Sequence, residues 1–168
     1  TDSINYAQRI QEALLPGQDY IDSLFENFVI YLPKAIVSGD FYFLSRINEY
    51  IIFAVGDCTG HGVPGGFLTM MGINFLNDIV ERKEILTTAQ ALEKLRSKIK
   101  HVFRHSDKHD GIDMALCAYN TNTNVLQFSG AFLPLILIRN NEIIEKSCVR
   151  TPVSFHYNEL RFITHEFK

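Results

Sequence analysis

Residues 54–66 (Ala-Val-Gly-Asp-Cys-Thr-Gly-His-Gly-Val-Pro-Gly-Gly) constrain the fold more than any other stretch of the chain. The run that leads into them, residues 50–55, is apolar and β-branched and predicts a buried strand. The glycines allow sharp turns and close backbone approach, and Pro64 is well placed to open a helix. We therefore expect Asp57 to lie where a strand ends and a helix is about to begin.

A second carboxylate, Asp40, closes another segment that we expect to be extended, residues 31–37. If the two strands are neighbours, Asp40 and Asp57 converge at one place. Convergent carboxylates and loop carbonyls are the ligands that Mg²⁺ and Mn²⁺ prefer. The same Asp-x-x-Gly pattern also fits a plain turn, in which the Asp57 side chain accepts hydrogen bonds from nearby backbone N–H groups. Spacing alone does not choose between the metal site and the turn.

Two motifs connect the chain to a known family. The sequences SGDFY at residues 38–42 and GDCTGHGVP at residues 56–64 resemble motifs of the metal-dependent PPM-type (type 2C-like) serine/threonine phosphatases. The similarity is to the branch named after stage II sporulation protein E (SpoIIE). It continues through residues 110–117, 126–131 and 134–135 and so covers most of the chain. The resemblance favours the metal site over the turn.

The resemblance implies an α+β fold, an α/β/β/α sandwich of mainly antiparallel sheets with flanking helices. It also implies a two-metal site for Mn²⁺ or Mg²⁺. Asp57 would bridge the two ions, the backbone carbonyl of Cys58 would complete one shell, and Asp40 would hold the second ion directly or through water. His61 corresponds to a motif histidine that shapes the site or helps proton transfer. Such a site hydrolyses phosphate monoesters with a metal-activated water.

The chain departs from the family pattern at its C-terminal end. Two further metal-binding aspartates of the family, one in a Ser-Asp-Gly segment and one before a last strand, have no counterpart in the 168 residues. We therefore expect residues 1–17 to be a linker helix and residues 18–168 to be a C-terminally truncated phosphatase domain. Asp113 matches a strand position without a ligand role in the family. We interpret it as structural or as a secondary contact of the site.

Hydrophobic periodicity gives the order of the elements. Helices are expected at residues 3–15, from Pro64 and after Thr87, where Thr87 and Gln90 fit a capping box. Strands are expected at residues 28–32, 41–44, 50–55, 112–119, 125–128 and 133–138. This order indicates an α+β fold with helices on one side of a mainly antiparallel sheet.

The N-terminal helix is open to two interpretations. Ile4, Ala7, Ile10 or Gln11, and Leu14 recur at helical spacing. The helix is either the linker of a larger signalling protein or an element that packs on its own domain. Exposure of Ile4, Ala7 and Ile10 distinguishes the two, and an exposed apolar stripe would also support a homodimer through this helix.

Charge and composition exclude several classes of partner. A net charge of −3 offers no basic surface for nucleic acid. No apolar run approaches the roughly 20 residues needed to span a bilayer, and we expect no direct membrane contact. Three scattered cysteines without Cys-x-x-Cys spacing favour a reducing compartment. We expect a cytoplasmic protein, or the cytoplasmic part of a larger sensor.

The predicted function is that of a metal-dependent protein serine/threonine phosphatase domain in a bacterial signalling protein. The resemblance implies phosphoserine or phosphothreonine on a regulatory protein as substrate, with an anti-sigma-factor antagonist as the expected partner. The truncated chain alone would be inactive if the missing ligands are required. The alternative is a catalytically degenerate module that binds a phosphoprotein or relays a signal through its N-terminal helix.

Overall fold

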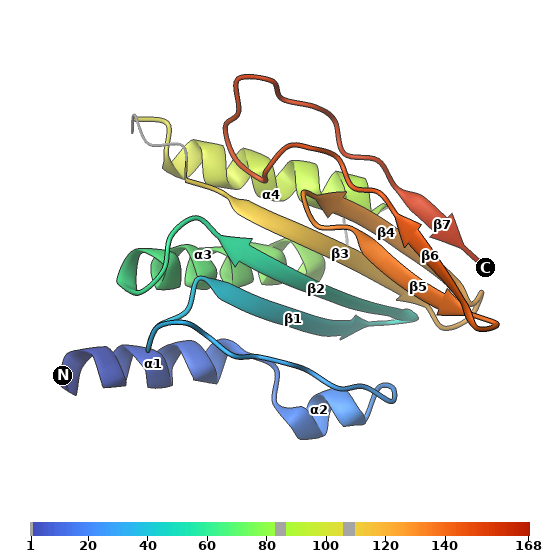
Figure 1. Cartoon of the computed structure of the whole chain (residues 1–168), viewed down its shortest axis with the longest axis horizontal. Helices are drawn as coiled ribbons and strands as arrows, with labels where there is room; N and C mark the ends of the chain where they lie inside the picture. Colours follow the sequence, from blue (N-terminus) through green and yellow to red (C-terminus); the bar gives the residue numbers. More distant parts are fainter. Residues whose placement is uncertain (1, 83–86, 106–109) are drawn as a thin grey trace.

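A computed structural model describes residues 2–82, 87–105 and 110–168. An antiparallel sheet with the strand order β1-β2-β3-β4-β7 organises them (Figure 1). Its strands are β1 (Asp40–Ile47), β2 (Tyr50–Cys58), β3 (Ile112–Asn120), β4 (Val125–Ala131) and β7 (His165–Phe167). A separate antiparallel hairpin is formed by β5 (Leu135–Arg139) and β6 (Glu142–Lys146). The predicted mainly antiparallel character of the sheets is confirmed.

The helices flank the sheet as expected. Helices α3 (Val63–Glu81) and α4 (Thr88–Val102) pack side by side against the same face of the five-stranded sheet (Figure 1). The N-terminal helix α1 (Asp2–Leu14) lies against α3, and the short α2 (Gln18–Asp22) follows it. The predicted cap of α4 is confirmed, because the Thr87 side chain accepts a hydrogen bond of 3.2 Å from the Gln90 backbone N–H.

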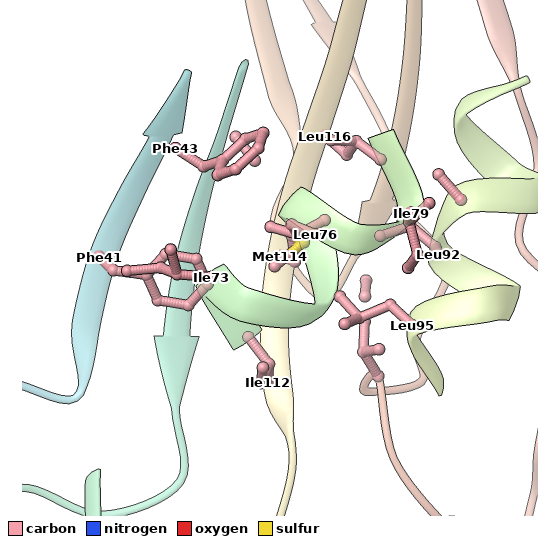
Figure 2. Close-up of a cluster of buried hydrophobic side chains, with 14 of the residues drawn as sticks. Phe41, Phe43, Ile73, Leu76, Ile79, Leu92, Leu95, Ile112, Met114 and Leu116 are labelled. Atoms are coloured by element: carbon pink, nitrogen blue, oxygen red, sulfur yellow. The ribbon is translucent and has the colours of Figure 1, made fainter. Parts of the chain in front are cut away.

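The main core lies between the sheet and these two helices (Figure 2). Alternate residues of each strand point to one face, so every second side chain of β1, β2 and β3 enters this core. The labelled core residues are Phe41, Phe43, Ile73, Leu76, Ile79, Leu92, Leu95, Ile112, Met114 and Leu116. Leu76 and Leu92 are fully buried, and truncating either one to alanine is expected to cost about 2–5 kcal/mol. Because the helices and the core cover this face of the sheet, residues that point to the other face are the ones available for a site.

The N-terminal segment departs from the sequence expectations at two points. The predicted strand at residues 28–32 is wrong, because the described residues supply it with no strand partner and Phe28, Ile30 and Leu32 are 77–87% exposed. The apolar run at residues 28–32 therefore does not mark a buried strand. Residues 31–37 are not a strand either, and Asp40 opens β1 instead of closing an earlier strand. Strand β6, strand β7 and helix α2 were not predicted.

The α1 helix agrees with its prediction, and its packing is mixed. Ile4 and Ala7 are partly buried against the domain, whereas Ile10 is 40% exposed. The one fully buried side chain of α1 is Gln11. The helix therefore packs on its own domain while leaving part of its apolar surface open. In the described parts of the chain, no helix has the length and apolar character needed to cross a membrane.

Candidate metal centre

The two predicted carboxylates lie directly opposite each other. In the β1–β2 hairpin, Asp40 at the start of β1 pairs in register with Asp57 near the end of β2. Their neighbours Phe41 and Cys58 are buried in the core against α3. Because side chains alternate along a strand, both carboxylates project from the opposite face of the sheet. The structure thus brings together the two residues that the sequence predicts as the centre of a site.

Close backbone packing holds the loops that carry these aspartates. A Cβ atom on Gly39 would lie 2.5 Å from the carbonyl oxygen of Gly60, and one on Gly65 would lie 2.6 Å from the same atom. The Cys58 N–H donates a hydrogen bond of 3.1 Å to the Gly39 carbonyl. Gly60 has a φ of +86°, in the left-handed region that favours glycine. The Asp40 loop, the Asp57 loop and the first turn of α3 therefore pack backbone against backbone.

A third carboxylate, Asp113, lies in the same row. It pairs in register with Asp57 across β2 and β3. The end of β2 is held to the start of β3 by Thr59, whose backbone N–H donates to the Gly111 carbonyl at 2.9 Å and whose Oγ1 accepts from the Gly111 N–H at 3.0 Å. The strand alternation at residues 112–119 was predictable, but the register was not. Asp113 therefore belongs to the surroundings of the candidate site.

Within the described part of the chain, this row of carboxylates forms no ion pair with a protein cation. The ion pairs of these residues lie elsewhere, for example between Lys98 and Asp78. Burial, and then the charge and hydrogen bonding of Asp57, raise the pKa of Asp40. Burial and the Asp57 charge also raise the pKa of Asp113. The site therefore carries uncompensated negative charge.

A cleft of about 260 Å³ opens beside Asp40 and Asp57. Its walls come from the segment before β1, from β1 and β2, and from Leu133; the lining residues are Val29, Ile30, Tyr31, Leu32, Asp40, Phe41, Tyr42, Val55, Gly56, Asp57 and Leu133. The Tyr31 hydroxyl donates to the Asp40 backbone carbonyl at 3.2 Å, and its ring meets the Tyr42 ring edge to face, 5.7 Å between centroids. These contacts hold residues 29–32, which are in neither a helix nor a strand, against β1. None of these lining residues is a Lys, Arg or His.

The other two predicted site residues lie in the same loop. The Cys58 side chain is buried, lies 3.7 Å from the Thr69 hydroxyl, and has a pKa raised to about 12 chiefly by burial. Its thiol therefore points into the core and only its backbone faces the loop. His61 is exposed, two residues before α3 begins. The implied roles, metal ligation by the Cys58 carbonyl and proton transfer or shaping of the site by His61, therefore stay predictions.

The donor set fits a hydrated divalent ion better than a closed protein cage. Within residues 2–82, 87–105 and 110–168, no group of three or more His, Cys, Asp or Glu side chains is arranged to hold a metal. Mg²⁺ commonly keeps several waters and takes only one or two carboxylates from the protein. The Asp40 and Asp57 pair satisfies that requirement, because oxygen ligands and negative charge are both present.

Comparison with known proteins defines the class as the PP2C phosphatase fold. The chain is similar to the SiaA-PP2C domain of Pseudomonas aeruginosa with a TM-score of 0.86 and 26% identity, over 99% of this chain and 65% of that one. The structure of the PP2C phosphatase domain and a regulatory-domain fragment of SpoIIE from Bacillus subtilis gives a TM-score of 0.64 and 18% identity, over 79% and 37%. The family model for stage II sporulation protein E (SpoIIE) matches residues 48–155. The chain therefore belongs to the SpoIIE family.

The similarity also has limits. A Stage II sporulation E family protein from Thermanaerovibrio acidaminovorans matches with a TM-score of 0.52 and 11% identity, over 62% of this chain and 51% of that one. This chain spans only part of each of these three solved chains, and the largest share that it covers is 65%. No curated protein is similar enough in sequence to be matched. These matches establish the fold of the chain and its family.

Proposed function

We propose that this domain is a metal-dependent protein serine/threonine phosphatase that acts on phosphoserine or phosphothreonine in a regulatory protein. The observation that carries the proposal is the Asp40 and Asp57 pair, placed opposite each other beside a cleft. Membership of the SpoIIE family supports the same reaction class. An anti-sigma-factor antagonist is the partner that we expect from the family resemblance.

The charge of the site supports a requirement for Mn²⁺ or Mg²⁺. A phosphate monoester is an anion, and the cleft offers it carboxylates and no cationic side chain among its lining residues. Bound divalent ions would supply the missing positive charge and lower the pKa of an attacking water. In this proposal Asp57 and Asp40 hold the ions, with the Cys58 carbonyl as a further oxygen donor. His61 lies in the same loop and, in this proposal, shapes the site or accepts a proton.

The remainder of the cleft suits a peptide. Most of its lining residues are apolar, among them Val29, Ile30 and Leu32 from the segment before β1 and Val55 from β2. Apolar walls around a charged centre fit a phosphorylated side chain whose neighbouring residues contact protein surface. At about 260 Å³ the cleft is smaller than the roughly 300–1,000 Å³ typical of pockets that enclose a whole small molecule. This arrangement supports a phosphorylated side chain of a protein as the substrate.

Calorimetric titration of Mn²⁺ tests the proposal, with wild type and Asp57→Asn compared and with Asp19→Asn as a control. Asp19 is an exposed carboxylate on α2, outside the site. We expect saturable binding in wild type and in the control, and none in Asp57→Asn. Wild type and Asp19→Asn should likewise release phosphate from a phosphoserine peptide, and Asp57→Asn should not. Equal Mn²⁺ binding by wild type and Asp57→Asn would refute the metal site.

A further inference from the structure

Gln11 is an unusual residue for the buried position of a surface helix. Its side chain is only 3% exposed, and it is the one fully buried residue of α1. A primary amide taken out of water is unfavourable unless its donor and acceptor are both satisfied. The contacts that satisfy it therefore show what the residue does.

Both ends of the Gln11 amide bind the backbone of one residue, Ser38. Gln11 Nε2 donates to the Ser38 carbonyl at 2.7 Å, and Gln11 Oε1 accepts from the Ser38 N–H at 2.8 Å. Two such bonds fix both the position and the orientation of the Ser38 peptide groups. The N-terminal helix is thereby attached to a segment 27 residues further along the chain.

Ser38 in turn is connected to both carboxylate-bearing strands. Its Oγ accepts a hydrogen bond of 3.0 Å from the Asp40 backbone N–H. The buried Thr69 hydroxyl of α3 donates to the Gly39 carbonyl at 2.9 Å, and the same carbonyl accepts from the Cys58 N–H. A continuous set of hydrogen bonds thus runs from α1 through residues 38–40 to the end of β2.

We propose that Gln11 is a positioning residue, which holds the Ser38-to-Asp40 segment so that the Asp40 carboxylate stays opposite Asp57. Gln11 touches neither substrate nor metal in this role. Through it, α1 becomes part of the support of the candidate site. The link to metal binding rests on the proposed function, whereas the link to the geometry of Asp40 does not.

Amide hydrogen exchange of the metal-free chain tests the geometric part. Gln11→Leu keeps most of the side-chain volume and removes both hydrogen bonds. Gln8→Leu is the matched control, because Gln8 lies one turn earlier on α1 and binds Glu12 at the surface, 2.9 Å away. We expect exchange at Ser38, Asp40 and Cys58 to be about tenfold faster in Gln11→Leu. Exchange at Leu116, the central residue of strand β3, should not change.

A second variant separates the hydrogen bond between Ser38 and Asp40 from the attachment of α1 to Ser38. Ser38→Ala removes the hydroxyl that accepts the Asp40 N–H and leaves both Gln11 contacts, which use the Ser38 backbone. We expect it to speed exchange at Asp40 without releasing α1. If Gln11→Leu does not fold, Gln11→Met takes its place, because its unbranched side chain fills the site while also lacking both hydrogen-bonding groups.

Mn²⁺ titration of the same variants tests the link to the site. We expect the affinity to fall about tenfold in Gln11→Leu and to be unchanged in Gln8→Leu. Unchanged exchange at Asp40 in the folded Gln11 variant would overturn the positioning role of Gln11, whatever Ser38→Ala shows. Absence of Mn²⁺ binding in wild type would instead contradict the proposed function, while the exchange result would still decide the role of Gln11.

Discussion

Asp40 and Asp57 face each other across the open end of the β1–β2 hairpin, on the side of the sheet away from α3. The buried residues next to them, Phe41 and Cys58, fix this orientation because turning either strand over would expose the core. The fold therefore keeps two like charges together. Repulsion between them is a feature of the metal-free domain, and a divalent ion relieves it.

The first prediction is that Asp57→Asn makes the metal-free domain more stable. Removing the central carboxylate of the row relieves its repulsion with Asp40 and Asp113. Because these groups are partly solvated, the gain is small, and we expect the melting temperature in EDTA to rise by about 1–3 °C. Asp19→Asn, remote from the row, is the control. A lower melting temperature for Asp57→Asn would show that this carboxylate has a structural role.

The second prediction concerns the pH dependence of that gain. In the folded state the pKa values of Asp40 and Asp113 are raised above the ordinary value of 3.8. At a pH between 3.8 and the raised pKa, the folded state therefore binds more protons than the unfolded state. These groups therefore favour the fold at low pH, and their contribution is lost as the pH rises through the raised pKa.

The difference in melting temperature between Asp57→Asn and wild type should consequently be smallest near pH 4 and reach its full size at neutral pH. Thermal unfolding in EDTA at several pH values measures it. A difference that is constant from pH 4 to pH 8 would mean that repulsion with Asp57 does not raise these pKa values.

The third prediction is that Gly65→Ala disrupts the site loops. A Cβ at this position would meet the Gly60 carbonyl oxygen at 2.6 Å and the Gly39 Cα at 3.0 Å, and both are backbone atoms that cannot swing away. We expect a loss of about 2 kcal/mol or more in the free energy of unfolding, with loss of Mn²⁺ binding. Gly17→Ala is the matched control, since a methyl group added there would have no atom within 4 Å and the φ of Gly17 is −67°. Denaturant unfolding of both variants gives the comparison, and equal stability would contradict the prediction.

The features of this fold that could be predicted from sequence are those set by local pattern. The apolar run of β2 and the glycines before Pro64 predicted the strand, loop and helix that the structure contains. The motif resemblance predicted that Asp40 and Asp57 come together. Residues 28–32 misled the prediction because a strand needs a partner, and an apolar run does not reveal whether one exists.

Other features depend on contacts between distant parts of the chain. The alignment of Asp113 with Asp57 follows from the register of β2 and β3. Side-chain alternation does not determine this register, because sliding one strand by two residues keeps the same side chains on the same face. At α1, helical spacing admitted either Ile10 or Gln11 on the inner face. The structure buries Gln11 and leaves Ile10 exposed, because the backbone of Ser38 offers the amide two partners. A polar residue at an apolar position of a helix was the available signal.

The fourth prediction is that Cys58→Ser has almost no effect on Mn²⁺ binding. Only the backbone carbonyl of Cys58 belongs to the proposed site, since the thiol is buried beside Thr69 with a pKa of about 12. A serine hydroxyl at this position can donate to the Thr69 oxygen, whose own proton goes to the Gly39 carbonyl, and we expect a cost of about 1 kcal/mol in stability for a polar group in the core. We expect calorimetric affinities within about twofold of wild type. Cys117→Ser is the control, because Cys117 is another buried thiol with a pKa of about 12, in the middle of β3. A large loss of affinity in Cys58→Ser alone would mean that the side chain, and not only the carbonyl, shapes the metal site.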